Sequence, residues 1–376
     1  MCNESVIPYD LVATKMNHWY VALKNNWVEK AKKMKAEVKQ EINLMEENQD
    51  ALVYFSLLEF RHELMLDYLY PNANRDIHQQ CEALKKTKGN RDLTGMLEYY
   101  YHFFMGMYYF RQNELVHSLR CYRQAERELE YVEDQDVERA EFYFKISEIF
   151  YYMKQTYFSM HYAKMAYELY RNQPTYGVRQ VHCQFVIVGN WLDNMRHDRA
   201  LKHAYQALED AKKIGENYLI RKSLFNIGIC YDKLEEPSKS SHFFMKSLEI
   251  EEPENLNFQA RAWYMLSLVE GKQSNLDKAK EFYRKAKKIA KKCDDKVILA
   301  KLKMVKGLYL SRDLDLIRET FEFFKETQMY PDMEWYGVCV GDHLTNQKEL
   351  KGANEFYRRA IDARIQIQRG ELVHES

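Results

Sequence analysis

The sequence predicts an all-α protein whose main part is a superhelix of paired-helix repeats. A small residue recurs about every 40 positions, and a second small residue stands seven positions before each of these markers. Paired helices need such residues because their backbones must approach closely at fixed offsets. With 13 glycines and 6 prolines in 376 residues, a β-rich or disordered chain is excluded. The markers are Ala125, Ala166, Ala207, Ser247, Ala286 and Ala360, and the residues seven earlier are Ser118, Ser159, Ala200, Ser240, Ala279 and Ala353.

Residues 1–70 are expected to form a bundle of three helices that precedes the repeats. Apolar residues recur there at helical spacing, for example Ala31, Met34, Val38 and Ile42 on one face of the second helix. Asp50 is expected to cap the third helix. The predicted helices run from about Tyr9 to Leu23, from Trp27 to Glu47 and from Asp50 to Tyr68.

A polar linker over residues 71–92, with a short helix at about Ile77–Lys86, is expected to separate the bundle from the repeat domain. Pro71 and Gly89 suit a hinge there. The repeat domain then covers 93–376, with about seven helical hairpins. Their expected ranges are 95–130, 138–171, 179–214, 219–251, 259–292, 297–327 and 334–368.

The hairpins resemble tetratricopeptide repeats. Small residues stand 19 positions before most markers, as at Gly106 and Gly228, and Trp263 occupies the tryptophan position of that family's first helix. The sixth hairpin departs from the pattern, because Glu319 stands where a small residue is expected. Such a repeat domain predicts a binding surface and leaves its ligand open.

Composition favours a cytoplasmic location. Acidic and basic residues balance at 56 each, so no global field favours nucleic acid or an anionic membrane as a partner. Seven cysteines without a CxxC pair are typical of reduced thiols in the cytosol. The first residues lack the pattern of a secretion signal, and no apolar run is long enough to span a bilayer.

The candidate chemistry lies in the segment Met45–Asp50, an acidic corner that also bears carboxamides. Phosphate-binding loops, nucleophile elbows and zinc motifs are absent from the sequence. One interpretation is a hydrated capping corner. The alternative uses Gln49, whose carboxamide has no useful pKa but can orient a water molecule for in-line attack on a phosphoryl group of a partner protein.

Several runs resemble the Rap family of sporulating Gram-positive bacteria, which are tetratricopeptide-repeat regulators switched by short imported Phr peptides. The runs extend over bundle, linker and repeats. They are Trp19-Tyr20, Met45-Glu46-Glu47-Asn48-Gln49-Asp50, Phe60-Arg61-His62-Glu63 with Met65-Leu66, Leu93-Thr94-Gly95-Met96-Leu97-Glu98-Tyr99-Tyr100, and Tyr152-Met153-Lys154-Gln155-Thr156-Tyr157-Phe158-Ser159-Met160.

The resemblance implies a response-regulator aspartate phosphatase, with Gln49 as the residue that positions the hydrolytic water. Phosphatases of the family typically have Asp before this glutamine, whereas this chain has Asn48. The resemblance implies no intrinsic cofactor, and it places Mg²⁺ on the partner receiver domain. The implied receiver-binding residues are Glu47, Asn48, Asp50, Phe60, Met96, Asp134 and Glu138.

The same resemblance implies a site for a Phr pentapeptide or hexapeptide in the repeat domain. Asn226 in an N-I-G segment would pair with peptide backbone, and Asp193 in an N-x-L-D segment would take a basic group. Asn190 is a further candidate. Peptide binding is expected to tighten the superhelix, so that the bundle swings onto it and hides the receiver-binding surface.

Two other functions remain open from the sequence. The chain could sequester a DNA-binding response regulator without catalysis, released again by a Phr peptide. It could also be a peptide-sensing transcription factor, but residues 1–70 lack a helix-turn-helix glycine turn and the second helix carries mixed charge, which argues against DNA binding.

Overall fold

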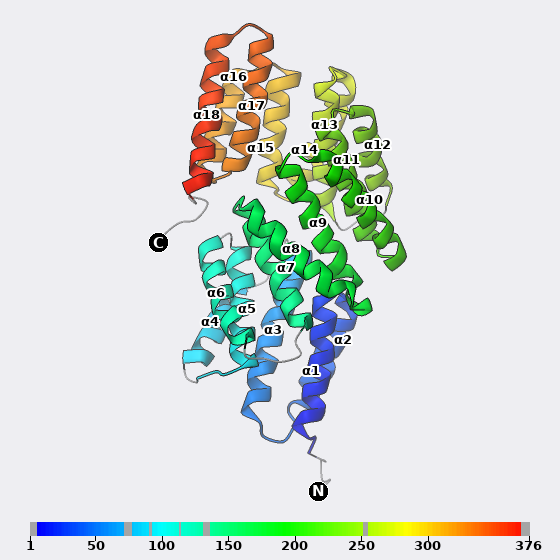
Figure 1. Ribbon diagram of the computed structural model, residues 1–376, viewed down its shortest axis with the longest axis vertical. Coiled ribbons are helices and arrows are strands. Elements are labelled where there is room, and N and C mark those ends of the chain that lie inside the picture. Colours follow the sequence, from blue (N-terminus) through cyan, green and yellow to red (C-terminus); the bar gives the residue numbers. More distant parts are fainter. Residues whose placement is uncertain are drawn as a thin grey trace. The chain divides into compact units, whose positions relative to one another are not determined.

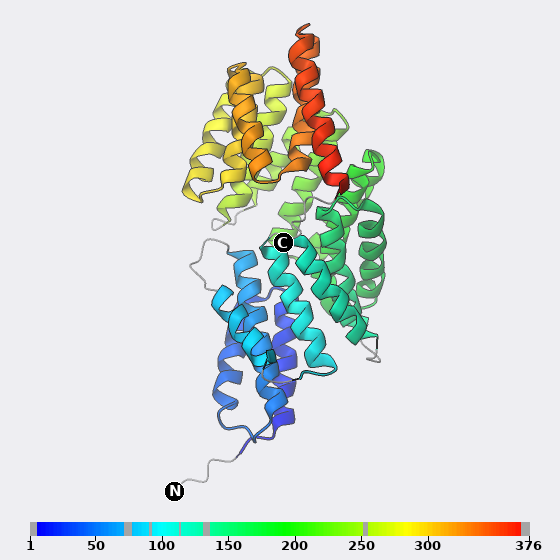
Figure 2. The same ribbon diagram turned by 90° about the vertical axis from the view of Figure 1, so that its left-hand side faces the viewer.

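The computed structural model describes residues 6–70, 77–89, 92–112, 114–130, 136–250 and 255–369. These residues form eighteen α-helices with one 3-10 turn and one π turn, and the described part of the chain contains no strand. Figures 1 and 2 show the helices following one another as antiparallel pairs that can be traced by colour from cyan to red. The predicted fold class is confirmed.

The chain divides into two compact units. Among the described residues, the first contains those within 6–149 and 161–183, and the second contains those within 150–160 and 184–369. The predicted boundaries at residues 70 and 92 stay a prediction, because residues 71–76, 90 and 91 lie outside the described ranges. The helices that precede the hairpins are α1 (Tyr9–Lys24), α2 (Val28–Glu41), α3 (Gln49–Leu69) and α4 (Ile77–Gly89).

Within the described part of the chain, seven helical hairpins follow α4, in agreement with the predicted number. The 3-10 turn η1 (Pro174–Tyr176) precedes the third hairpin, and the π turn η2 (Lys306–Leu310) lies within the sixth. The hairpins are α5 (Met96–Arg111) with α6 (Leu115–Leu129), α7 (Asp136–Tyr152) with α8 (Thr156–Arg171), α9 (Gly177–Asp193) with α10 (His197–Ile214), α11 (Asn217–Lys233) with α12 (Pro237–Glu249), α13 (Leu256–Lys272) with α14 (Leu276–Lys292), α15 (Lys296–Val305) with α16 (Leu314–Glu326), and α17 (Tyr330–Asn346) with α18 (Leu350–Arg369).

Small residues allow the two helices of a hairpin to touch. A Cβ atom placed on Gly106 of α5 would lie 2.4 Å from the ring of Tyr122 on α6, so a larger residue there would displace this ring. The hydroxyl of Ser118 donates to the carbonyl of Gly106 at 2.6 Å. The fourth hairpin repeats this pair of contacts, with Ser240 donating to the Gly228 carbonyl at 2.8 Å. The small residues in the sequence therefore mark real helix–helix contacts.

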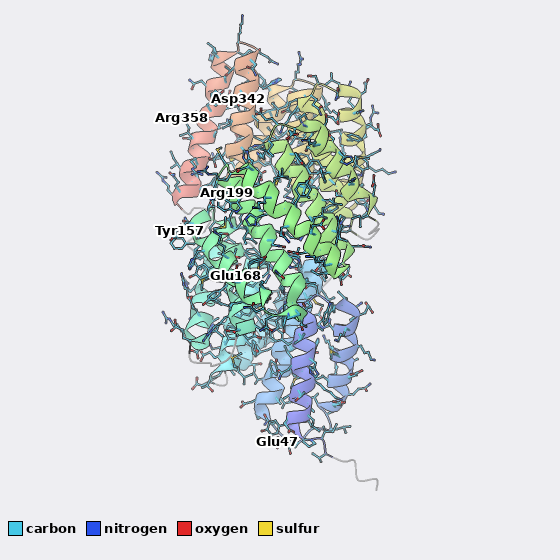
Figure 3. The ribbon with its side chains drawn as sticks, turned by 45° about the vertical axis from the view of Figure 1, so that its right-hand side comes forward. Glu47, Tyr157, Glu168, Arg199, Asp342 and Arg358 are labelled. Atoms are coloured by element: carbon cyan, nitrogen blue, oxygen red, sulfur yellow. The ribbon has the colours of Figure 1, made fainter. Side chains whose placement is uncertain are left out.

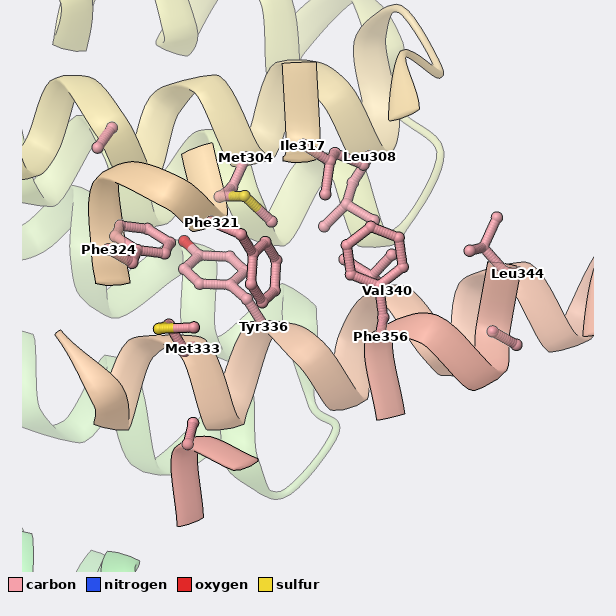
Figure 4. Close-up of a cluster of buried hydrophobic side chains, with 13 residues drawn as sticks. Met304, Leu308, Ile317, Phe321, Phe324, Met333, Tyr336, Val340, Leu344 and Phe356 are labelled. Atoms are coloured by element: carbon pink, nitrogen blue, oxygen red, sulfur yellow. The ribbon is translucent and has the colours of Figure 1, made fainter. Parts of the chain in front are cut away.

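The sixth hairpin changes this register, as its sequence suggested. The π turn η2 lies just before α16, and a Cβ on Gly307 would meet Ile317, ten positions later, at 2.6 Å. At Gly106 and Gly228 the corresponding neighbour is an aromatic ring 16 positions later. The core of the sixth hairpin remains apolar and rich in aromatic rings. Figure 4 shows Tyr336 of α17 beside Phe321 and Phe324 of α16, and the Phe324 and Tyr336 rings stack with centroids 5.7 Å apart.

Two details of the bundle differ from the sequence predictions. The second helix ends at Glu41 rather than Glu47, because the chain then turns and Met45 forms a bridge with Ile7. The cap of α3 is Asn48 rather than Asp50: the Asn48 Oδ1 accepts from the backbone N–H of Ala51 at 3.0 Å.

The described residues give two further observations on the cysteines and on membranes. The six cysteines in these ranges are free, and burial raises the pKa of the Cys230 thiol to about 12. No helix within these ranges is long and apolar enough to cross a bilayer.

A buried charge cluster joins α7 to neighbouring helices in the first unit. Glu141 is fully buried, with one carboxylate oxygen accepting from Arg179 at 2.8 Å and the other from the Tyr170 hydroxyl at 2.7 Å. Burial by itself raises the pKa of Glu141. The charges of Arg179, Lys145 and Arg61 outweigh burial, so the pKa lies below the ordinary value of 4.5.

This lowered pKa predicts a loss of stability in acid. The contribution of Glu141 is fully present above pH 4.5 and is lost as the pH falls through the lower folded-state pKa. Glu141→Gln should lower the free energy of unfolding at pH 7 and flatten its decline between about pH 5 and pH 3. Urea unfolding across this range measures both effects, with exposed Glu281→Gln as the control. Equal acid slopes for wild type and Glu141→Gln would contradict the prediction.

Candidate functional site

The corner that bears Gln49 is fastened to the chain segment that precedes α1. The N–H of Ile7 donates to the Leu44 carbonyl at 2.9 Å, and the Ile7 carbonyl accepts from the N–H of Glu46 at 2.9 Å. The Glu46 carboxylate accepts from the N–H of Tyr9 at 3.1 Å. These bonds fix the connection between α2 and α3 although it has no regular secondary structure.

Glu47 and Gln49 are exposed at this corner, and Gln49 is the first residue of α3. Figure 3 shows Glu47 at the end of the bundle, beside the start of α1. Asn48 between them is partly buried as the cap of α3. Because Asp and Asn both serve well as helix caps, the asparagine keeps the geometry of the corner and changes only its charge.

A groove of about 970 Å³ opens in the first unit, lined by residues of α1, α3, α5 and α7 and by residues around η1. Three carboxylates on its wall, those of Asp50, Asp92 and Asp136, belong to exposed residues. Tyrosine rings contribute to the apolar part of the wall, and the rings of Tyr54 and Tyr100 stack with centroids 5.5 Å apart. Four predicted receiver-binding residues line this groove, namely Asn48, Asp50, Met96 and Glu138.

An ion pair between Lys24 and Glu138 is buried in the wall of the groove. Its N–O distance is 2.6 Å, and the two side chains are 4% and 6% exposed. The Tyr20 hydroxyl donates to the other Glu138 oxygen at 3.2 Å. Burial, and then the charge of Glu138, raises the pKa of Tyr20, so the phenol stays protonated. The pair therefore links α1 of the bundle to α7 of the second hairpin.

The other predicted receiver-binding residues lie in different surroundings. Phe60 is 1% exposed in the core between α3 and α5, where its ring lies 6.0 Å from that of Tyr108. Asp134 lies outside the described residues. In this arrangement Phe60 and Glu138 are covered, whereas Glu47 and Asp50 are accessible.

The predicted peptide-binding residues lie in the second unit. Asn190 is fully buried, and its amide donates to Ser159 at 2.8 Å and to the Val186 carbonyl at 3.0 Å. Asp193 forms an ion pair with Lys154 at 2.9 Å, with both side chains about a quarter exposed. Asn226 is partly exposed on α11, and its carboxamide has no hydrogen bond within the described ranges.

The sequence analysis did not predict which residues form ion pairs in the repeat domain. Lys154 pairs with Asp193 39 positions later, and Asp232 pairs with Lys272 40 positions later at 2.7 Å. Both intervals equal one repeat length. Opposite charges that stand one repeat apart in the sequence could therefore have indicated these ion pairs. Lys24 was detectable as a single cation at the end of the apolar stripe of α1.

Two known protein families match parts of this chain. The family described as response regulator aspartate phosphatase H, N terminal, matches residues 6–67, and the tetratricopeptide repeat family matches 222–253 and 260–293. The chain is thus a tetratricopeptide-repeat protein with an N-terminal domain of the response-regulator phosphatase type.

Individual relatives are similar to this chain over nearly its whole length. The chain is 44% identical to response regulator aspartate phosphatase I of Bacillus subtilis, over 98% of this chain and 95% of that protein. It is 34% identical to the regulatory protein RapF of the same organism, over 98% of both chains. A crystal structure of a Rap protein complexed with competence and sporulation factor superposes with a TM-score of 0.86 at 36% identity, covering 96% of this chain and all of that one. The chain belongs to the Rap family.

The Lys24–Glu138 pair predicts a large effect of removing one partner. Lys24→Met or Glu138→Gln should lower the free energy of unfolding by about 3–5 kcal/mol, because the remaining group loses its buried ionic partner. The double variant should recover part of this loss. Urea unfolding measures the cycle, and Lys303→Met at an exposed ion pair should change stability by less than about 1 kcal/mol. A loss below about 1 kcal/mol for both buried variants would contradict the prediction.

Proposed function

We propose that this chain hydrolyses the aspartyl phosphate of a response regulator and that an imported signalling peptide inhibits it. The observation that carries the proposal is the exposed Gln49 at the first position of α3, on a corner held by backbone bonds to Ile7. Membership of the Rap family supports the reaction, since relatives are named response regulator aspartate phosphatases. A residue that works in another protein's active site must be both exposed and rigid.

In the proposed reaction, water attacks the phosphorus of the phosphorylated receiver. The phosphorus–oxygen bond to the receiver's aspartate breaks, and inorganic phosphate and a free carboxylate are released. The Gln49 carboxamide accepts a hydrogen bond from the water and so orients it without taking its proton, and the protons of the water leave on the inorganic phosphate. The Mg²⁺ expected on the receiver supplies positive charge to the phosphoryl oxygens. Asn48 leaves one negative charge fewer at this position than aspartate would.

The groove beside the corner supports a receiver-binding role for the first unit. Asp50, Asp92 and Asp136 line it together with Asn48 and Met96, so its wall suits a polar segment that carries positive charge. Glu138 faces the same groove but is paired with Lys24. The receiver would gain contact with Glu138 and Phe60 only in an arrangement that opens the interface between the bundle and α5 to α7.

The inhibitory peptide is proposed to bind in the second unit at Asn226 and Asp193. A carboxamide can pair with both the N–H and the carbonyl of a peptide backbone, which suits the free side chain of Asn226. The ion pair of Asp193 with Lys154 gives this proposal a specific form, because a basic group on the peptide must displace Lys154. Asn190 would act by holding Ser159 and so bracing α9.

A second candidate function is sequestration of a response regulator without catalysis. Asn48 favours it, because the typical aspartate is missing beside Gln49. The relative named regulatory protein RapF shows that names in the family are not restricted to phosphatases. The two functions predict the same binding surface and differ in whether receiver phosphate is released.

Substitution of Gln49 separates the two candidates. With a panel of phosphorylated receivers, Gln49→Ala should lower the rate of dephosphorylation by about 100-fold, because the water loses its orienting group. Receiver binding should change little. Loss of labelled phosphate from the receiver measures the rate, and Gln124→Ala, at an exposed position on α6, is the control. A wild-type rate in Gln49→Ala would contradict the phosphatase proposal, and binding without dephosphorylation by wild type would favour sequestration.

Peptide binding can be tested at Asp193 and Asn226. Asp193→Asn or Asn226→Ala should weaken an inhibitory pentapeptide or hexapeptide by about 5- to 150-fold, corresponding to about 1–3 kcal/mol for a lost hydrogen bond or charge contact. Lys154→Ala should strengthen a peptide with a basic group, since it removes the competing cation. Calorimetric titration measures the affinities, with exposed Asp198→Asn as the control. Unchanged affinity in both site variants would place the peptide elsewhere.

A further inference from the structure

Helix α1 obtains its N-terminal cap from a distant residue. The residue before the helix is Pro8, which has no side-chain acceptor and makes no cap hydrogen bond. The first N–H of the helix, that of Tyr9, is instead bound by the Glu46 carboxylate, 37 positions along the chain. A carboxylate at this position also interacts favourably with the helix dipole. The corner before α3 thus supplies the side-chain acceptor that Pro8 cannot provide.

Backbone bonds reinforce this contact. Ile7 pairs with Leu44 and Glu46 through two hydrogen bonds of 2.9 Å, as in a short parallel bridge. The Glu46 side-chain bond and these two backbone bonds together form a three-point clamp between the start of α1 and the corner. A single bond would leave the corner free to pivot, whereas two bonds at Ile7 and one at Tyr9 together restrict both translation and rotation.

The other end of the corner is fixed by the cap of α3. The Asn48 carbonyl accepts from the N–H of Leu52 at 3.2 Å, and its side chain accepts from Ala51 at 3.0 Å. Only Glu47 and Asn48 separate Glu46 from Gln49. The backbone of Gln49 is therefore held between the clamp and the first turn of α3, while its side chain is left exposed.

We infer that Glu46 is a positioning residue for the reaction, acting on Gln49 through the clamp rather than by touching the receiver's phosphoryl group. This inference rests on the proposed phosphatase function and deepens it. Positioning matters because a displacement of about 1 Å in a catalytic group can lower a rate about 100-fold. Glu46 is exposed and adds nothing to the apolar core, so its substitution leaves the bundle folded.

The test compares Glu46→Ala with Glu46→Gln in the full-length chain, using a phosphorylated receiver that wild type dephosphorylates. Glu46→Ala should lower kcat at least about tenfold and leave KM for the receiver within about twofold. Glu46→Gln keeps an oxygen acceptor for the Tyr9 N–H and should restore most of kcat. Glu37→Ala, at an exposed position on α2, is the matched control and should behave as wild type.

A second variant tests the clamp without changing a charge. Ile7→Pro removes the N–H that binds the Leu44 carbonyl and should lower kcat as Glu46→Ala does. Amide hydrogen exchange should become faster in Glu46→Ala around residues 6–12 and 43–50, with the rest of α3 unchanged. This measurement reports the clamp directly and does not depend on activity.

The possible outcomes distinguish failure of the phosphatase function from failure of the positioning role of Glu46. If Gln49→Ala retains wild-type dephosphorylation, the phosphatase function fails and the positioning role fails with it. If Gln49→Ala is impaired but Glu46→Ala keeps its kcat, only the positioning role is overturned. A Glu46→Ala variant with a raised KM and unchanged kcat would instead make Glu46 a receiver-binding residue, and this also overturns the inference.

Discussion

Close approach of the two helices in each hairpin is the constraint on which the rest of this structure depends. At Gly106 the Tyr122 ring occupies the space that any Cβ would need, and Ser118 bonds to the carbonyl exposed there. The same arrangement recurs at Gly228 and Ser240. Because dispersion and hydrogen bonding both require this short separation, each hairpin has a nearly fixed geometry that its neighbours can stack on.

In the first unit, buried ion pairs connect helices in addition to their apolar contacts. Lys24 pairs with Glu138 and Arg179 pairs with Glu141, so α7 bonds to α1 through one carboxylate and to α9 through another. Buried ion pairs contribute little net stability compared with apolar residues, because desolvation offsets their attraction. An arrangement that separates the partners would leave a buried charge without compensation. The Lys24–Glu138 pair therefore fixes where α1 of the bundle contacts α7.

The residues proposed for chemistry must be exposed to a partner, whereas the core residues are buried. Gln49 is exposed, carries no charge and depends for its position on bonds made by its neighbours Glu46 and Asn48. The proposed peptide contacts at Asp193 and Asn226 are also partly accessible, and the Lys154 pair gives Asp193 a competing partner. The proposed catalytic residue and the proposed peptide contacts are thus surface groups, Gln49 in the first unit and Asp193 and Asn226 in the second.

The sequence by itself determined the all-helical class, the seven hairpins and the corner that contains Gln49. It could do so because small residues and apolar periodicity report local packing directly, as at Ser118 and Ser240. It did not determine where α2 ends, since the bridge from Met45 to Ile7 depends on a contact between distant segments. It also did not decide between Asn48 and Asp50 as the cap of α3, because both residue types cap helices well. Only the tertiary structure decided that Glu138 is covered by Lys24 and that Glu46 caps α1, because both are pairings of charged groups over long sequence distances for which one chain offers many partners.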